Sequence, residues 1–478
     1  MAINYATQIL IIRYLSKSDY GAFAYALSIA AVLAAAIQLG LDRGLARYLP
    51  IYDEEKNHGA ITGAIAFVGG LTAALGLMVA VGFWATRSAI QGAIEADPLA
   101  MSILAILVVL APIDGLDNLL VTVLAAFRRT GAIFLRRYVV APLLKLSVVL
   151  LLIGGGGDVT FLAIGYTGAG FLGLVVFASV LGKYLRDIRG EHGGGRRRMP
   201  VKQLMAFSLP LLTTDLVFIT LNATDAFMLE WFGSTEDVAA LRAVQPTARL
   251  NTLVLSAFGV LFIPFAARLF ARGQHDEIGR RYWQTASWVV VLTLPILCAC
   301  LLFPNELTGS LLGSDYSESA VVLGILSVGY FIHAMFGYNG MTLNVYGKVK
   351  FLVGVNLLAV ITNVGLNISL IPRFGPLGAA IGTAGTYLIH NAAKQFGVLR
   401  RAGLPGAPSD TWRLYAVVAG LVIASAVIGY GTSLALAVRI AVWIAFALTV
   451  VLTGRRSLRI EEAFPGLAKL PLVKRVFS

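Results

Sequence analysis

The sequence predicts an all-α protein that crosses a membrane many times, and three observations carry this prediction. Hydrophobic residues occupy 58% of the 478 positions, charged residues only 13%, and the mean hydropathy is +0.80. The apolar residues gather in about fourteen runs, and most runs reach the ~20 residues that a membrane-spanning helix needs. Thirty of the 38 Lys and Arg residues fall in alternate gaps between these runs. A soluble protein of this length could not cover such a chain with polar surface.

The predicted membrane helices follow one another with short gaps. The first run is too short for a full span, which leaves open a start codon placed too far downstream or a shortened first helix. In chain order the runs are 2–15, 20–46, 60–84, 99–126, 132–153, 159–185, 204–232, 238–270, 283–303, 319–346, 350–371, 376–399, 412–431 and 433–453.

The distribution of basic residues predicts the orientation. The gaps after every second run, together with the C-terminal tail, hold the thirty cations, among which we count Arg136, Arg137 and Lys394. Cytoplasmic loops of membrane proteins are enriched in Lys and Arg, so both termini are expected in the cytoplasm. The net charge is +13, and the basic residues are divided among seven short segments, which favours topology and anionic headgroups over nucleic acid as the explanation.

The longest polar break divides the chain. The Gly-rich, basic segment 182–202 predicts a flexible cytoplasmic linker, and AIGYTG at Ala163 returns as AIGTAG at Ala380. We therefore expect an N-terminal six-helix lobe (1–185), a linker (186–203), a second six-helix lobe (204–400), two additional transmembrane helices (401–453) and a cytoplasmic tail (454–478). Two such lobes suit an alternating-access transporter, although chance likeness between Gly/Ala-rich helices also explains the repeat.

Cations inside apolar runs are the first candidates for function, because each costs about 2.5–3.5 kcal/mol to insert at the centre of a membrane helix. Lys145 lies in the fifth run, and Arg242 and Arg249 lie in the eighth. We expect them to line a water-filled cavity and to bind an anionic headgroup. The alternative is that each forms a neutral structural pair between adjacent helices.

Four aspartates are the corresponding acidic candidates. Asp114 and Asp117 share one face of the fourth run, while Asp215 and Asp225 lie in the seventh. They are expected to pair with the cations, Asp225 with Arg242 or Arg249 and Asp114 with Lys145, or to take part in ion coupling.

Further polar residues in apolar runs are weaker candidates, since hydrogen bonds between helices explain most of them; they are His333, Asn339, Asn344, Asn363 and Asn367. The sequence has no phosphate-binding P-loop, no HExxH and no Cys/His cluster at metal spacing, and its two cysteines are expected to be small buried hydrophobes. We predict no cofactor, no metal and no enzymatic activity; H⁺ or Na⁺ coupling, or the membrane potential alone, remain as energy sources.

Four segments carry a resemblance to a known family. YGAFAYALSIAAVLAAAIQLGLDRGLARYLPIYDEEK from Tyr20 resembles the second helix of polysaccharide flippases of the multidrug/oligosaccharidyl-lipid/polysaccharide superfamily. FIPFAARLFARGQHDEI from Phe262 resembles the end of their eighth helix, and FPNELTGSLLGSDYSESAVVLGILSVG from Phe303 their loop before helix ten. NVYGKVKFLVGVNLLAVITNVGLNISLIPRFGPLGAAIGTA from Asn344 resembles helices eleven and twelve.

The resemblance implies a fourteen-helix flippase that moves a polyprenyl-pyrophosphate-linked oligosaccharide to the outer leaflet of the bacterial cytoplasmic membrane, for O-antigen or exopolysaccharide synthesis. It implies a cationic cavity, for which Arg249, Lys145 and Arg242 are the available residues. Expected partners are the lipid-linked glycan, membrane lipids, and the polymerase and export machinery. A cation-coupled multidrug exporter and a lipid II flippase of the same superfamily are the alternatives.

Overall fold

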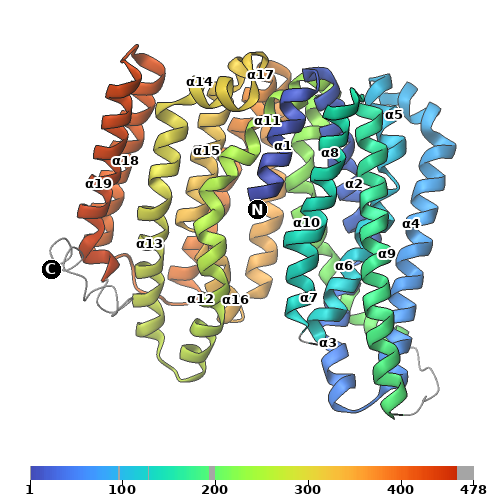
Figure 1. Ribbon diagram of the computed structural model, residues 1–478. Helices are drawn as coiled ribbons and strands as arrows, with labels where there is room; N and C mark the ends of the chain where they lie inside the picture. Colours follow the sequence, from blue (N-terminus) through green and yellow to red (C-terminus); the bar gives the residue numbers. More distant parts are fainter. Residues whose placement is uncertain (1, 95–96, 128, 193–199, 460–478) are drawn as a thin grey trace. The chain divides into compact units, whose positions relative to one another are not determined.

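The computed structural model describes residues 2–94, 97–127, 129–192 and 200–459, and every regular element in these ranges is a helix. Ten helical segments of the described chain are long and apolar enough to cross a membrane. The predicted all-α, multi-pass architecture is therefore confirmed (Figure 1). Most gaps between helices lie close to the predicted ones.

The chain forms two compact units, Met1–Arg242 (unit 1) and Ala243–Ser478 (unit 2). The helices of unit 1 are α1 (Ala2–Tyr14), α2 (Lys17–Gln38), α3 (Leu41–Glu54), α4 (His58–Ile94), α5 (Pro98–Leu107), α6 (Leu110–Ala126), α7 (Thr130–Phe134), the π-helical η1 (Leu135–Val140), α8 (Ala141–Gly155), α9 (Val159–His192) and α10 (Val201–Phe232). Helix α11 (Thr235–Arg249) begins in unit 1 and ends in unit 2.

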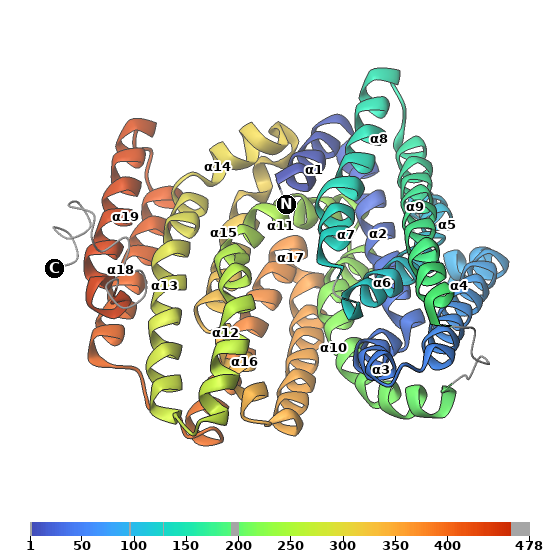
Figure 2. The same cartoon turned by 60° about the horizontal axis from the view of Figure 1, so that its bottom comes forward.

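Helix α2 is the centre of unit 1 and packs against α5, α6 and α10 (Figures 1 and 2). It can approach its neighbours closely because small residues fill its buried face, among them Gly21, Ala22 and Ala26. Helix α3 lies against α6 and α10, where Leu41 and Leu45 are fully buried in an aliphatic cluster. The close packing of this unit therefore depends on the small size of these residues as well as on their hydropathy.

The closest approach in unit 1 gives a stability prediction. A Cβ at Gly21 would lie 1.9 Å from the backbone oxygen of Thr235, whereas a Cβ at Gly82 of α4 would meet no atom within 4 Å. Both glycines are helical, so alanine gains the same helix propensity at either place. Gly21→Ala is expected to destabilise the protein by about 1–3 kcal/mol or more, as overpacking does. Gly82→Ala should be neutral or stabilising, and equal melting temperatures for the two variants in detergent would contradict the close packing of α2 on the start of α11.

The helices of unit 2 follow the end of α11. They are the 3₁₀ turn η2 (Leu250–Thr252), α12 (Leu253–Ala271), α13 (His275–Leu302), α14 (Pro304–Leu307), the π-helical η3 (Thr308–Leu312), the 3₁₀ segment η4 (Ser314–Ser319), α15 (Ala320–Met335), α16 (Tyr338–Val345), α17 (Val349–Arg400), α18 (Ser409–Gly431) and α19 (Leu436–Leu458). Helix α13 is central and packs against α12, α15, α18 and α19. The two additional helices predicted at 412–431 and 433–453 correspond to α18 and α19.

Helix α17 joins two of the predicted runs at a sharp kink. Gly375 has φ 53° and ψ −129°, a conformation outside the helical region that glycine adopts without steric cost. Pro372 and Pro376 flank it, and neither ring nitrogen can donate a helical hydrogen bond. The two predicted helices, 350–371 and 376–399, therefore follow one another with almost no loop.

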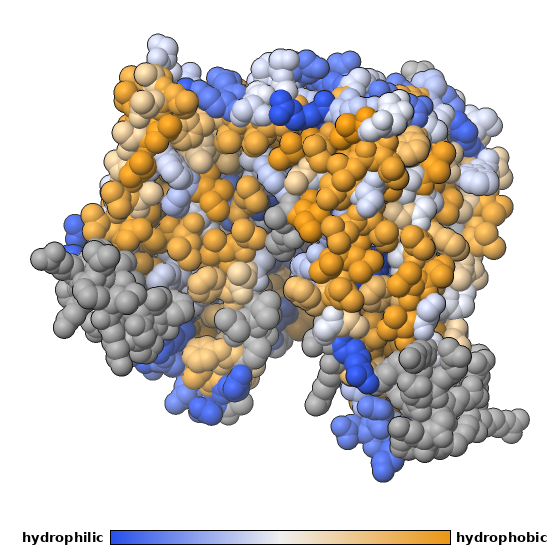
Figure 3. Space-filling model, in the orientation of Figure 1, coloured by the Kyte–Doolittle hydropathy of each residue, from blue (hydrophilic) through white to orange (hydrophobic). Residues whose placement is uncertain are grey.

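Apolar side chains cover the outer faces of both units. In unit 1 they include Leu77 and Met78 of α4, which are 65% and 62% exposed, and in unit 2 Ile423 of α18, which is 65% exposed. Figure 3 shows apolar surface along the middle of the helices of each unit on the visible face, and hydrophilic surface near their ends. Such surface is stable only in contact with lipid.

Two predicted segments fall partly outside the described residues. Helix α9 continues to His192 and α10 begins at Val201, so of the predicted linker only 193–199 lie outside them. Of the predicted tail, 460–478 lie outside them. The proposed lobe boundaries stay predictions.

Candidate functional site

The predicted cations occupy three different places. Lys145 lies in α8 of unit 1, Arg242 lies at the end of unit 1 in α11, and Arg249 is the last residue of α11 and belongs to unit 2. Lys145 and Arg249 are each surrounded by further polar side chains.

Unit 1 contains a polar cavity of about 220 Å³, which we call the unit 1 pocket. Its lining combines three cations with one carboxylate and two carboxamides, supplied by α1, α6, η1 and α8. The lining residues are Asn4, Asp117, Asn118, Val121, Arg136, Arg137, Ala141, Pro142 and Lys145. The structure thus brings the predicted residues Lys145 and Asp117 into one cavity.

Asp117 is neutralised by an arginine that the sequence analysis assigned to a loop. The Nε and Nη2 atoms of Arg136 lie 2.9 and 2.8 Å from Oδ1 of Asp117, and the Arg136 side chain is only 7% exposed. Its guanidinium lies 5.4 Å from the centre of the Phe177 ring, and against Gly173, where a Cβ would lie 2.9 Å from Nη2. Arg136 was counted with the gap after the fourth run, but it lies in the helical segment η1 and its side chain points inward, while its side of the membrane stays a prediction.

A proline explains why Arg136 points inward. Pro142 has no N–H with which to donate to the carbonyl of Tyr138, so the helical ladder is interrupted there. The preceding segment η1 is π-helical, and the N–H of Ala141 donates to the carbonyl of Arg136, five residues earlier. π-Helical turns are rare and often occur at functional sites. In this chain the turn carries Arg136 and Arg137 into the pocket.

Lys145 is an exposed cation at the other side of the pocket. Its Nζ lies 5.3 Å from the centre of the Tyr166 ring, a distance at which a cation is attracted to the ring face. Asp114, one turn before Asp117, is also exposed and interacts electrostatically with Lys145 and Arg136. The expected proximity of Asp114 and Lys145 agrees with this interaction.

The other charged candidates, Asp215, Asp225 and Arg242, are not among the described residues that line the unit 1 pocket. Asp225 is buried in α10, at 4% exposure. Arg242 is half-buried and interacts electrostatically with Tyr20 of α2. Asp215 lies in α10 at a position whose side chain is outside the described part of the structure. The proposed pairing of Asp225 with Arg242 or Arg249 stays a prediction.

In unit 2, Arg249 is held by a buried tyrosine. Its Nε donates to the hydroxyl of Tyr330 at 3.0 Å, and its guanidinium carbon lies 5.8 Å from the centre of the same ring. Gln245, one turn earlier in α11, donates to the same hydroxyl at 3.0 Å. The ring of Tyr330 is 3% exposed, whereas Arg249 is exposed. The tyrosine therefore fixes the position of a cation that remains accessible.

The polar contacts continue from Tyr330 along α15 and α17. Tyr330 contacts Tyr387, with ring centres 5.5 Å apart, and Tyr387 stacks on His333 at 4.8 Å. Nδ1 of His333 lies 3.3 Å from the carboxamide nitrogen of Asn391, and Asn339 donates to the backbone oxygen of Asn391 at 3.2 Å. We call the following residues the unit 2 cluster: Arg249, Tyr330, His333, Asn339, Tyr387, Asn391 and Lys394.

Lys394 is the second cation of this cluster. It is half-buried in α17, one turn after His390, and a Cβ at Gly340 would lie 3.6 Å from its Nζ. It interacts electrostatically with His333 and His390. Lys394 was counted with the gap after the twelfth run, but it lies inside α17, which continues to Arg400.

The remaining weak candidates lie apart from the cluster. Asn367 donates to Asn363 at 3.3 Å, and both side chains are buried in α17, which is the expected structural use of such residues. Asn344 is exposed near the end of α16. Among the described residues, no group of His, Cys, Asp and Glu could hold a metal ion.

The residues missed from the sequence share one signal. Arg136 and Arg137 fall inside the predicted run 132–153, and Lys394 falls inside the predicted run 376–399. Each was nevertheless counted with the neighbouring gap, because a cation near the end of a run fits both assignments. For Lys394, the four-residue spacing from His390 places the two side chains on one face of a helix.

The chemistry of both places suits an anion with attached hydroxyl groups. Guanidinium and ammonium groups donate to phosphate oxygens in charge-assisted hydrogen bonds. Carboxamides such as Asn4 and Asn118 both donate and accept, as sugar hydroxyls require. A cationic ligand would find more repulsion than attraction in the unit 1 pocket.

Two family profiles match the chain. The profile of the polysaccharide biosynthesis protein family matches residues 1–270, more than half of the chain, and the MatE profile matches residues 210–369. An uncharacterised membrane protein of Methanocaldococcus jannaschii is 22% identical over 400 residues, which cover 81% of this chain and 78% of that protein. A probable low-salt glycan biosynthesis flippase of Haloferax volcanii is 21% identical over 166 residues, 35% of each chain.

Solved structures share the fold. A lipid II flippase in an inward closed conformation aligns with a TM-score of 0.74 at 14% identity, covering 96% of this chain and 97% of that chain. An inward-facing transporter of the multidrug resistance MATE family aligns with a TM-score of 0.67 at 15% identity, covering 84% and 94%. These relatives are a flippase and a transporter rather than enzymes. The predicted superfamily fold is confirmed.

Proposed function

The chain belongs to the polysaccharide biosynthesis protein family and is a transporter of the multidrug/oligosaccharidyl-lipid/polysaccharide superfamily, and from this premise we propose that it moves a polyprenyl-pyrophosphate-linked oligosaccharide across the membrane. The movement is from the cytoplasmic to the outer leaflet, by alternating access, and serves the synthesis of a surface polysaccharide such as O-antigen or exopolysaccharide. The proposed location is the cytoplasmic membrane, with both termini in the cytoplasm. The two curated relatives are archaeal, so the proposed host widens from bacteria to prokaryotes.

The composition of the unit 1 pocket is the observation that carries the proposal. Arg136 pairs with Asp117, so the lining keeps an excess of two positive charges, Arg137 and Lys145, while Asp114 interacts with Lys145 from outside the lining. Two positive groups beside two carboxamides match a pyrophosphate followed by a sugar. A pyrophosphate and sugars cannot cross ~30 Å of hydrocarbon unaided, because their polar groups would lose their hydrogen bonds with water. The polyprenyl tail has no such barrier and stays in lipid.

The unit 2 cluster supports the same class of substrate. Arg249 and Lys394 place two cations among the aromatic and carboxamide side chains of α15 and α17. We assign Arg249, Lys145 and Arg242 to headgroup binding, and Asp114, Asp117, Asp215 and Asp225 to charge balance or ion coupling.

The membrane potential can supply the energy. Two negative charges that cross the whole field outward, from an inside-negative cytoplasm, release about 4.6 kcal/mol per 100 mV. Coupling to H⁺ or Na⁺ is the second proposed source of energy. A polymerase and an export apparatus are proposed to consume the product.

A lipid II flippase is the rival with a specific observation in its favour, namely the fold shared with such a protein over 96% of this chain. Lipid II carries the same pyrophosphate and polyprenyl groups, so the pocket chemistry does not separate the two. A multidrug exporter is favoured by the MatE profile over residues 210–369, but the excess of cations in the unit 1 pocket repels cationic drugs.

Deletion of the gene tests the proposal. Lipid-linked oligosaccharide is expected to accumulate in the cytoplasmic leaflet and surface polysaccharide to fall, as measured by leaflet-resolved labelling and mass spectrometry. Lys145→Gln should restore transport roughly 2- to 10-fold less well than the wild type, since Lys145 is exposed and the amide still donates, so that only about 0.5–1.5 kcal/mol is lost. Arg47→Gln is the matched control, because Arg47 is an exposed cation of unit 1 that lies 5.6 Å from the centre of the Tyr48 ring, outside the pocket.

Three outcomes distinguish the three candidate functions. Accumulation of the oligosaccharide precursor supports the proposal, and accumulation of lipid II identifies the rival flippase. Unchanged amounts and leaflets of both lipids, with increased drug sensitivity, would replace the proposal by drug export.

A further inference from the structure

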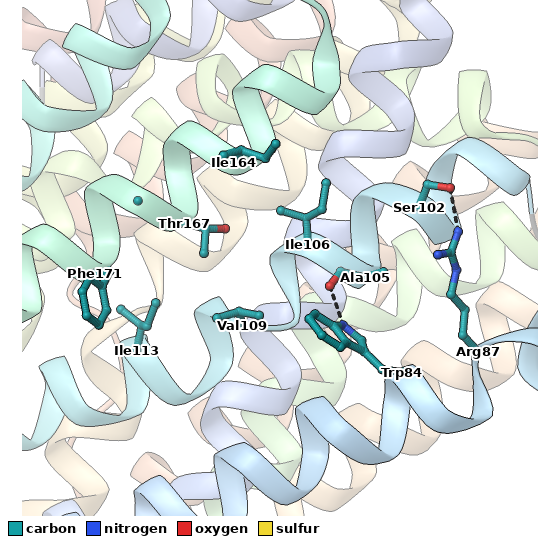
Figure 4. Close-up of a pocket in the computed structure, with 11 residues that line it drawn as sticks. Trp84, Arg87, Ser102, Ala105, Ile106, Val109, Ile113, Ile164, Thr167 and Phe171 are labelled. Carbon is teal, nitrogen blue, oxygen red and sulfur yellow. Dashed lines mark hydrogen bonds between the residues drawn. The ribbon is translucent and has the colours of Figure 1, made fainter.

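A second and larger cavity lies in unit 1, away from the unit 1 pocket. It has a volume of about 830 Å³ and lies between α4 and α9, with α5 and α6 beneath (Figure 4). We call it the α4–α9 groove. Its lining residues are Trp84, Arg87, Ser102, Ala105, Ile106, Val109, Ile113, Ile164, Thr167, Gly168 and Phe171.

The groove is open to the surroundings of the protein. Trp84, Ile164 and Phe171 line it and are 60%, 58% and 59% exposed. Helices α4 and α9 each pack against α5 and α6, which form the floor. All four helices belong to the membrane-spanning part of unit 1, so the space between them opens toward lipid.

A break in the floor shapes the groove. Pro112 cannot donate to the carbonyl of Val108, and Ala111 donates to this carbonyl instead, at 3.1 Å. The helix is interrupted between α5 and α6, and the N–H of Val109 turns to Ile106 instead of Ala105. The indole of Trp84 satisfies the carbonyl of Ala105 at 2.8 Å, which fixes the ring on the floor (Figure 4).

The two ends of the groove differ in chemistry. At one end the Nη2 of Arg87 donates to the hydroxyl of Ser102 at 2.8 Å, and no carboxylate among the described residues forms an ion pair with Arg87. Toward the other end Ile113 and Phe171 provide an apolar surface. From Ser102 to Ile113 the floor rises by about 16 Å, at 1.5 Å per residue. That length matches half of a ~30 Å hydrocarbon layer, which is one leaflet.

We propose that the α4–α9 groove binds one anionic phospholipid of the surrounding membrane. Arg87 receives the phosphate, the Trp84 indole lies at the level of the glycerol backbone, and one acyl chain follows the floor to Ile113 and Phe171. Arg87, which forms no ion pair with a carboxylate of the described residues, selects a negative headgroup, and the length of the apolar floor selects a chain confined to one leaflet. This site does not depend on the identity of the transported substrate.

Quenching of Trp84 fluorescence by brominated lipid tests the proposal. The full-length protein, with its other five tryptophans changed to Phe, is reconstituted with phosphatidylglycerol or phosphatidylcholine brominated in the acyl chain. Phosphatidylglycerol is expected to occupy the groove with about 5-fold higher relative affinity, the effect of one cation on an anionic lipid. Arg87→Gln should abolish this preference while leaving the quenching by phosphatidylcholine unchanged.

Filling the groove provides a second variant. A Cβ at Gly168 meets no atom within 4 Å and Gly168 lines the groove, so Gly168→Phe directs a side chain into the cavity from an uncrowded backbone position. Gly82→Phe is the matched control, because Gly82 has equally open surroundings and lies outside the groove lining. Gly168→Phe should reduce quenching by both lipids, and Gly82→Phe should not.

Some results would overturn the proposal. Equal quenching by both lipids that Gly168→Phe does not change would mean that the groove contains only exchanging bulk lipid. Displacement of phosphatidylglycerol by an equal amount of polyprenyl phosphate would assign the groove to the tail of a substrate. If the protein with a single tryptophan does not fold, native mass spectrometry of the wild type and Gly168→Phe decides, with one retained phosphatidylglycerol fewer expected for the variant.

Discussion

Replacing Arg249 with glutamine should lower the transport rate roughly 10- to 100-fold. A hydrogen bond between a charged group and its partner contributes about 1.5–3 kcal/mol, and each 1.4 kcal/mol changes an equilibrium tenfold. Arg249 is exposed although it lies within a predicted membrane run, and the hydroxyl of Tyr330 holds it at 3.0 Å. The measurement is the appearance of labelled lipid-linked oligosaccharide in the outer leaflet of vesicles that contain the purified protein.

Three further variants make this test specific. Arg249→Lys keeps the charge but loses the planar fork of donors, so its rate should fall between those of the wild type and Arg249→Gln. Tyr330→Phe removes the hydroxyl that positions the guanidinium and should cost less than the loss of Arg249 itself. The control is Arg401→Gln, because Arg401 also lies 5.8 Å from the centre of an aromatic ring, that of Phe351, at the end of α17. Equal loss of transport in Arg249→Gln and Arg401→Gln would show that charge near the membrane, rather than the cluster, is what matters.

Replacing Arg136 with methionine should destabilise unit 1 by about 3 kcal/mol. The change leaves the carboxylate of Asp117 without its partner, and loss of one member of a buried ion pair costs about 3–5 kcal/mol. We expect the lower end of this range because the Asp117 side chain is 22% exposed. Unfolding in detergent, followed by intrinsic fluorescence, measures the difference.

A double variant separates the pair from its surroundings. Arg136→Met combined with Asp117→Leu removes both charges and should recover most of the lost stability, since the uncompensated carboxylate is gone. Arg280→Met is the matched control: Arg280 pairs with Glu277 but is 54% exposed, and exposed pairs contribute about 0–1 kcal/mol. If the double variant is as unstable as Arg136→Met alone, the arginine acts through packing against Phe177 and Gly173 rather than through its charge.

The sequence was sufficient for the architecture because hydropathy alone determines which segments can lie in lipid. It was insufficient for the positions of Arg136 and Lys394, because hydropathy does not give the rotation of a helix about its own axis. A cation near the end of a run satisfies the positive-inside rule and can equally face inward. For Arg136 the deciding feature was local, because Pro142 changed the helical register before α8. Lys394 lies well inside α17, which continues to Arg400.

The sequence predicted only those site residues that helical spacing or charge makes visible. Asp117 and Val121 of α6 line the cavity from one helix face, because four residues separate them, and Lys145 reaches the same cavity from α8. Tyr330 could not be selected from the sequence, because its role depends on a contact 81 residues away in the chain. Long-range hydrogen bonds of this kind have no periodic signature.

The π-helical turn η1 also limits which deletions this part of the sequence can tolerate. A π-helical turn contains one residue more than the α-helical turn it replaces, so it is equivalent to a single-codon insertion. Deleting one residue between positions 138 and 140 would restore α-helical register and rotate the preceding side chains by about 100° relative to α8. Every charged residue would still be encoded, yet Arg136 would turn away from Asp117. The length of this segment therefore constrains its evolution as strictly as its charges do.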